Sequence, residues 1–146
     1  MSTDPPVDPR GPRFAAWVTT LVLAVVLLTG WWPLLAAQAV VFGIGAFAGL
    51  RYAPYSLFYR ALIAPRLPRT GEREDAAPLR FAQAVGFGFA VVGVLGYAAG
   101  AGWVGALATA FALAAAFLNA AFGFCLGCET YLLLHRHETK EVSTTP

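Results

Sequence analysis

Two long stretches without a charged residue restrict what this chain can fold into. The first runs for 37 residues from Phe14 to Leu50, and the second runs for 48 residues from Phe81 to Cys128. A helix that crosses the hydrocarbon core of a bilayer needs roughly 20 residues, so each stretch has room for two crossings. Both stretches are apolar all round instead of alternating, which favours helices over barrel strands. We therefore expect two membrane-embedded helical hairpins.

Glycine, proline and tryptophan mark a turn inside each stretch, at residues 30–33 (Gly-Trp-Trp-Pro) and 100–103 (Gly-Ala-Gly-Trp). The expected fold is all-α, a four-helix transmembrane bundle made of two hairpins. It forms a single four-span domain over residues 1–137, followed by a disordered C-terminal tail over residues 138–146. The predicted spans cover approximately residues 14–31, 33–50, 81–99 and 103–126.

Composition agrees with a membrane protein of one compact domain. The 146 residues are 58% hydrophobic and only 12% charged, whereas soluble domains contain roughly 25% charged residues. No basic stripe with interleaved aromatic residues is present, so the sequence does not indicate a nucleic-acid partner. The expected environment is a lipid bilayer.

The distribution of basic residues predicts the orientation. All ten lysines and arginines lie before the first span, between Arg51 and Arg80, or after the fourth span, and the two hairpin turns carry none. With four spans, these three regions share one side, and the positive-inside rule assigns that side to the cytoplasm. We expect a multi-pass protein of the cell (inner) membrane with cytoplasmic N- and C-termini.

The central loop begins with a mixture of aromatic residues and arginines, from Arg51 to Ile63. This pattern predicts a short interfacial helix along the headgroups, followed by a hydrated link over residues 66–75. Two interpretations of the arginines stay open. They anchor the loop to anionic lipid, or they guide an anionic substrate or the acidic face of a partner.

Small residues recur at four-residue spacing in the spans, as in Gly45-x-x-x-Gly49 and Gly96-x-x-x-Gly100. Such spacing lets helix backbones approach closely in lipid, and our interpretation is a compact bundle without a cavity. No ionisable residue lies deep in a span, which argues against a proton-driven pump. Asn119 is interpreted as an interhelical hydrogen-bonding residue, with the lining of a substrate route as the alternative.

Cys125 and Cys128 form the one motif that carries chemistry, and we predict that they are the reactive pair. They are the only cysteines, which excludes a disulfide-stapled secreted fold. At about 1.5 Å per residue, Cys125 lies roughly 33 Å along the helix from Trp103, which places it at the cytoplasmic interface. We do not expect a stable structural disulfide on this reducing side of the membrane.

Four neighbouring residues are predicted to support the pair. A continuous helix would hold the two thiols adjacent but unbonded, whereas Gly123 and Gly127 weaken the helix on either side. If the helix breaks at Gly123 and restarts near Cys125, free N–H groups would stabilise a thiolate or persulfide. The Glu129 carboxylate would disfavour the thiolate. In a straight helix Asn119 would face away from both thiols, so it is a supporting residue only.

Other interpretations of the cysteine pair stay open. In one, the cysteines are inert small side chains in a helix contact, and in another they are sites of palmitoylation beside the membrane. No metal site and no cofactor is predicted, because the only candidate set lacks the usual spacing of its histidines. That candidate set is Cys125, Cys128, His135 and His137.

Two segments carry a resemblance to a known family: Val7 to Phe14 near the start, and Asn119 to Tyr131 around the cysteines. The chain resembles the bacterial membrane family filed as domain of unknown function 4395 (DUF4395), over roughly residues 7–135. The resemblance implies a small four-helix protein of the bacterial inner membrane. Relatives are often encoded beside thioredoxin-like or rhodanese-like sulfurtransferase proteins. The second segment is also similar to a membrane segment of some rhodaneses, which lacks the second cysteine.

The leading hypothesis is an integral membrane thiol protein. Cys125 and Cys128 would carry out dithiol–disulfide exchange or persulfide transfer with a cytoplasmic thioredoxin-like or rhodanese-like partner. One alternative is a transporter subunit for a small sulfur-containing anion, which would require a homo-oligomer because four spans are few. Another is a passive membrane anchor for a partner enzyme. The sequence leaves open whether the chain is an enzyme.

Overall fold

The computed structural model describes residues 10–68 and 76–143, and it describes side chains as far as Leu134. Every regular element in these ranges is a helix, so the predicted all-α class is confirmed for the described residues. Residues 1–9 and most of the predicted hydrated link lie outside the described residues.

Three helices are long and apolar enough to cross a membrane: α1 (Arg10–Thr29), α4 (Ala76–Ala98) and α5 (Gly102–Phe122). A shorter apolar helix covers Trp32–Ala48, in which α2 (Trp32–Gly43) continues into a π-helical turn, η1 (Ile44–Ala48). The predicted hairpin turns are confirmed, because Gly30 and Gly100 adopt φ values of 69° and 84° that favour glycine. The helices begin and end within a few residues of the predicted spans, except that the predicted fourth span is interrupted near its end.

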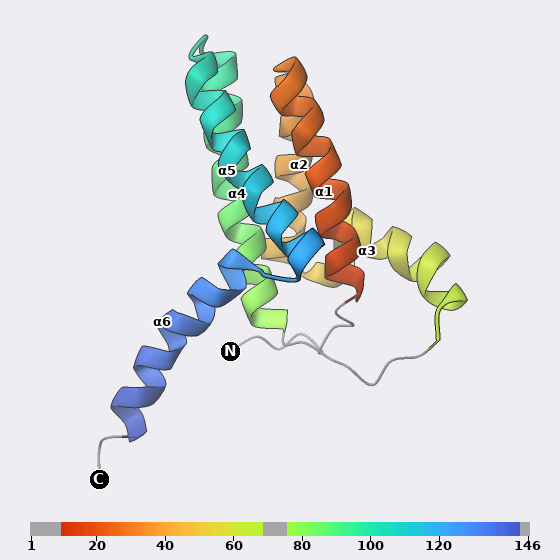
Figure 1. Ribbon diagram of the computed structural model, residues 1–146, viewed down its shortest axis with the longest axis vertical. Coiled ribbons are helices and arrows are strands. Elements are labelled where there is room, and N and C mark those ends of the chain that lie inside the picture. The colour runs from red at the N-terminus through yellow and green to blue at the C-terminus, as the bar shows by residue number, and fades with distance from the viewer. Residues whose placement is uncertain (1–9, 69–75, 144–146) are drawn as a thin grey trace.

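α1, α2, α4 and α5 lie side by side (Figure 1) and contribute to one core. α1 packs against α2 and α5, and α4 packs against α2 and α5. Glycine permits the closest approaches: a Cβ on Gly96 would lie 2.7 Å from the Gly105 backbone nitrogen, and one on Gly93 would lie 2.7 Å from Leu35. Gly96 therefore has the packing role expected of a small residue in lipid, whereas a Cβ on Gly100, the other residue of the predicted motif, would meet nothing within 4 Å. The buried core residues are Leu23, Val26, Leu35, Ala39, Phe42, Ala90 and Ala112.

A series of short helices connects α2 to the rest of the central loop: η2 (Leu50–Tyr52), α3 (Pro54–Phe58), η3 (Tyr59–Ile63) and η4 (Ala64–Arg66). They project sideways from the lower end of the bundle (Figure 1), so the predicted helical character of this segment is confirmed. Arg80 of α4 holds the end of η1 against the bundle. Its guanidinium donates to the carbonyl of Ala46 at 2.8 and 3.1 Å, where a cation complements the helix dipole.

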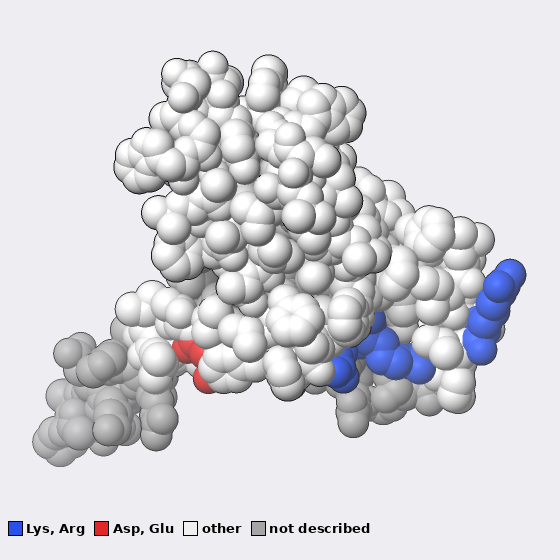
Figure 2. All heavy atoms as spheres, turned by 45° about the horizontal axis from the view of Figure 1, so that its top comes forward, with Lys and Arg blue, Asp and Glu red and all other residues white. Residues whose placement is uncertain are grey.

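The last helix, α6 (Leu126–Ser143), leaves the bundle at an angle and packs mainly against α4 (Figure 1). It continues the helix through residues 138–143, where the sequence analysis expected a disordered tail, and residues 144–146 lie outside the described residues. The surface of the apolar helices carries few charges on the face shown in Figure 2, where the described arginines gather beside the α3 end. This distribution agrees with a bilayer environment for the bundle.

Candidate functional site

The site begins where α5 ends. Gly123 adopts a left-handed conformation with φ 68° and terminates α5 after Phe122, a role that glycine performs without steric cost. The backbone N–H of Gly123 donates to the carbonyl of Asn119 at 3.0 Å, and that of Phe124 donates to Leu118 at 3.2 Å. The conditional expectation of a helix break at Gly123 is confirmed, and the predicted fourth span ends four residues early.

Cys125 is the N-cap of α6. Its carbonyl accepts the first hydrogen bond of the new helix, from the Glu129 N–H at 2.9 Å. Its Sγ accepts a hydrogen bond from the backbone N–H of Cys128 at 3.1 Å, as an N-cap side chain does. The Cys125 sulfur therefore lies at the positive end of the α6 dipole and accepts an N–H that has no partner within the helix. Both interactions stabilise negative charge on this sulfur.

Cys125 and Cys128 are joined by a disulfide, with their Cα atoms 5.1 Å apart. A stable disulfide was not expected here, because a continuous helix would hold the two thiols adjacent but unbonded and the cytoplasmic side is reducing. The physical reason for the difference is the position of Cys125 just outside the helix, where its side chain can turn back over the first turn. The separation lies within the range that disulfides require.

Gly127 has a packing role that the sequence did not show. A Cβ at this position would lie 2.6 Å from both the Cα and the Cβ of Ala82 in α4. Gly127 therefore lets α6 contact the backbone of α4, inside a helix that continues through it. The rings of Phe81 and Tyr131, 5.8 Å apart, extend the same contact. Of the two glycines predicted to weaken the helix, Gly123 breaks it, whereas Gly127 lies within α6 and is a contact residue.

A cavity of about 680 Å³ lies beside the pair, and its walls come from α1, α2, α4, α5, α6 and the central-loop helices. The expectation of a bundle without a cavity is wrong. The cavity exists because α5 stops at Phe122 and α6 turns away toward α4, so the lower end of the bundle is closed only partly. Of the two cysteines, Cys125 belongs to the lining and Cys128 does not.

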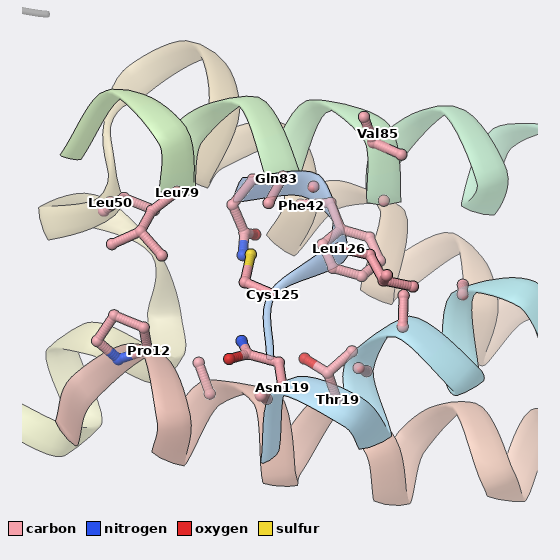
Figure 3. A pocket seen from close by; sticks show the side chains of 18 of the residues that line it. Pro12, Thr19, Phe42, Leu50, Leu79, Gln83, Val85, Asn119, Cys125 and Leu126 are labelled. Atoms are coloured by element: carbon pink, nitrogen blue, oxygen red, sulfur yellow. The ribbon is translucent and has the colours of Figure 1, made fainter. Parts of the chain in front are cut away.

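Two side-chain amides face this cavity together with Cys125. Figure 3 shows Gln83 and Asn119 on either side of Cys125, projecting from α4 and α5. Asn119 was expected to face away from the thiols in a straight helix, and the break at Gly123 brings Cys125 round to it. Sequence reasoning missed Gln83 as a site residue. The only feature of the sequence that could have indicated Gln83 was its polar amide within a long uncharged stretch.

The cavity also has a cationic end. Arg51 and Arg60 line it, and the two are linked because Arg60 donates to the backbone carbonyl of Arg51. The guanidinium of Arg51 also lies 5.3 Å from the centre of the Tyr52 ring. Both arginines come from the central loop, so the cavity extends from the central-loop end of the bundle into its apolar interior.

Glu129, the remaining predicted supporting residue, lies exposed in the first turn of α6. A carboxylate at this place interacts favourably with the helix dipole, and it does not line the cavity. The described residues contain no group of three or more potential metal ligands. His135 and His137 belong to the alternative metal set, and their side chains lie outside the described part of the chain.

A buried polar pair holds the interfacial segment against the bundle. The Tyr55 hydroxyl donates a 2.6 Å hydrogen bond to Oε1 of Gln38, whose side chain is only 1% exposed. Burial raises the pKa of the Tyr55 phenol above its ordinary value, because the phenolate would lose hydration. The hydroxyl therefore stays protonated and able to donate. This hydrogen bond positions the segment that carries Arg51 and Arg60.

The comparison with known families agrees with the segments singled out in the sequence. The family model described as Domain of unknown function (DUF4395) matches residues 7–136. The chain belongs to the DUF4395 family. The DUF4395 region includes both hairpins, the interfacial segment, the cavity and the cysteine pair. No curated protein matches the chain, and no solved structure matches it.

Proposed function

We propose that this DUF4395 protein crosses the inner membrane four times, as α1, α2 with η1, α4 and α5, with both ends in the cytoplasm. The support is the position of the basic residues at the helix ends that meet at one side of the bundle. The Trp32–Ala48 helix is the shortest crossing, at about 25 Å for its 17 residues. The cysteine pair then faces the cytoplasmic side.

The function that the site supports best is thiol chemistry with a cytoplasmic partner of the thioredoxin-like or rhodanese-like class. The observation that carries it is the N-cap position of Cys125, whose sulfur accepts the Cys128 N–H. This arrangement stabilises one of the two sulfurs as a thiolate and makes it the better leaving group. An inert pair of cysteines in a helix contact would not need that arrangement.

We propose different roles for the two sulfurs, because it is the Cys125 sulfur that accepts the Cys128 N–H. A partner thiolate attacks Cys128 Sγ, a new S–S bond forms between the partner and Cys128, and Cys125 leaves as the stabilised thiolate. A second partner thiolate then attacks the partner sulfur of the mixed disulfide and releases Cys128. The partner leaves as a disulfide, and the membrane pair is left reduced. Sulfur carriage would use the same Cys125 thiolate, which would take a sulfane sulfur as a persulfide.

Single-cysteine variants test this assignment in membranes supplied with a thioredoxin-like protein. When that protein is supplied in its oxidised, disulfide form, the Cys128 thiolate of Cys125→Ser attacks it and is expected to accumulate as a mixed disulfide, because the Cys125 thiolate that would displace the partner from Cys128 is absent. Cys128→Ser is the matched control and is expected to accumulate several-fold less, because Cys125 faces the cavity. Non-reducing electrophoresis with mass-tagged alkylation reads both. Equal trapping by the two variants would contradict the roles, and no trapping by either would refute the function.

A second candidate is a subunit of a transporter for a small sulfur-containing anion. The observation that favours it is that Arg51, Arg60 and Cys125 line one cavity. Thiosulfate uptake into proteoliposomes tests it. Arg60→Gln should lower the uptake rate, whereas Arg66→Gln, an exposed arginine of η4 outside the cavity lining, should not. Absence of flux under every gradient removes this candidate.

A further inference from the structure

The cavity beside Cys125 reaches the apolar surface of the bundle as well as its headgroup end. Val85, Phe89 and Phe111 belong to its lining, and these side chains are 39%, 37% and 56% exposed. Phe89 and Phe111 come from α4 and α5, and their ring centres lie 6.1 Å apart. In a bilayer these exposed apolar side chains face lipid, so a molecule dissolved in the membrane can enter from the side.

The lining is mostly apolar, with a few polar groups placed around the sulfur. Within the described part of the chain, the side-chain amides of Gln83 and Asn119 make no hydrogen bond. A half-buried amide without a partner is costly in apolar surroundings. Two such amides face one cavity from opposite sides of Cys125 (Figure 3), and their NH2 groups can donate hydrogen bonds to a ligand that accepts them.

The volume and the redox pair narrow the class of ligand. Pockets for small molecules and cofactors span roughly 300–1,000 Å³ and combine apolar walls with a few polar groups, and this cavity of about 680 Å³ fits that description. One sulfur of a two-electron redox pair is part of its wall. A ligand that enters from lipid, accepts hydrogen bonds and reacts with a dithiol is a two-electron acceptor dissolved in the membrane.

We propose that the cavity binds a lipid-soluble quinone, which oxidises the reduced Cys125–Cys128 pair. The inference rests on the proposed function, because the quinone would accept the electrons that the partner dithiol delivers to the cysteine pair. The Gln83 and Asn119 amides donate to the quinone oxygens, and the apolar walls hold the ring and the start of its tail. Arg51 and Arg60 stabilise the negative charge that develops on the ring during reduction.

The reaction balances between one dithiol and one quinone. The Cys125 thiolate attacks a ring carbon of the quinone, and a C–S bond forms. Cys128 Sγ then attacks Cys125 Sγ, so that the S–S bond forms, the C–S bond breaks and the electron pair stays with the ring. The two protons lost by the thiols end on the two ring oxygens. The products are the disulfide, as the structure shows it, and the quinol.

The first test uses the full chain in proteoliposomes, reduced with dithiothreitol and freed of reductant, under anaerobic conditions. Added ubiquinone-1 should be reduced in a one-to-one ratio with the reappearance of the disulfide, read by absorbance and mass-tagged alkylation. The cysteine-free double Ser variant should reduce none. Equal reduction by that variant would overturn the proposal.

The outcome separates this inference from the proposed function. If the reduced protein passes electrons to an oxidised thioredoxin-like protein but not to ubiquinone-1, the quinone site is refuted and the thiol function stands. If it reacts with neither, both are refuted. If dodecyl phosphate displaces ubiquinone-1 from the cavity and binds more tightly, the cavity is a site for amphipathic anions and the quinone proposal is overturned.

Neighbouring alanines of α5 provide a matched pair of variants. Ala115 lines the cavity, whereas Ala114 is exposed on the lipid-facing surface and does not line it. Ala115→Phe should weaken ubiquinone-1 binding by about tenfold, or about 1.4 kcal/mol, and Ala114→Phe should not. If Ala115→Phe does not fold, Gln83→Leu removes an amide at similar volume and should raise the KM for the quinone. Equal KM values for Gln83→Leu and wild type would overturn the binding mode.

Discussion

Gly127 is the position where one added carbon atom tests the placement of the cysteine pair most directly. A Cβ there would lie 2.6 Å from two atoms of Ala82, whereas ordinary van der Waals distances begin at 3.4 Å. One of these atoms is the α-carbon, so a rotation of the Ala82 side chain cannot relieve the clash. Gly127→Ala must therefore separate α6 from α4.

Gly88, a second helical glycine, provides the reference for the size of the effect. At Gly88, in the middle of α4, an added Cβ would meet nothing within 4 Å. Gly88→Ala should therefore show only the helix-propensity gain of about 1 kcal/mol. Gly127→Ala gains no more than this, because Gly127 is the second residue of α6, and overpacking costs about 1–3 kcal/mol. The difference between the two variants isolates the clash, and Gly127→Ala should be the less stable by about 1–3 kcal/mol.

The assay is reversible unfolding in mixed micelles, followed by circular dichroism as the fraction of denaturing detergent rises. Mass-tagged alkylation in the same samples reads the state of the pair. Adding Ala82→Gly to Gly127→Ala removes the clash between the two methyl groups but leaves the clash with the backbone of α4, so it should restore part of the lost stability. Equal stability of Gly127→Ala and Gly88→Ala would refute the packing of α6 on α4.

Three further substitutions have expected outcomes. Tyr55→Phe should cost about 1–3 kcal/mol, because buried Gln38 loses its partner. In thermal unfolding this wild-type advantage should hold up to the ordinary tyrosine pKa of 10.0 and disappear as pH rises through the raised pKa. Arg80→Met should destabilise by about 1.5–3 kcal/mol, because charged hydrogen bonds to the Ala46 carbonyl are lost, and detergent unfolding measures it. Gly123→Ala meets no neighbouring atom but forces alanine to a positive φ, so it should cost about 1 kcal/mol and lower the fraction of oxidised pair in alkylation assays.

The placement of the apolar helices was predictable because it depends on local composition. Uncharged stretches of sufficient length mark the helices, and the turns at Gly30 and Gly100 arise from residues that end helices. The break at Gly123 was foreseeable for the same reason, although only as a condition. Features that depend on short-range chemistry can therefore be predicted from the sequence.

The cavity was not predictable, because it depends on where α6 goes after the break. Gly127 looked like a second weak point of the helix, and only its close approach to Ala82 reveals the direction of α6. Gln83 lies 42 residues before Cys125 in the sequence, and nothing local relates the two. Asn119 would face away from the thiols in a straight helix. The break at Gly123 brings Cys125 to the same side as Asn119, so the expected orientation was wrong.

The three residues between α5 and α6 have a mechanical consequence for the cysteines. Cys125 is connected in sequence to α5, yet its position in space is set by α4, because α6 packs mainly against α4. Lengthening the connection by one residue should leave the sulfurs where they are. Inserting one residue in α4 ahead of Ala82 would turn that alanine by about 100° and remove the surface on which α6 rests. The register of α4 therefore controls thiols that lie on another helix.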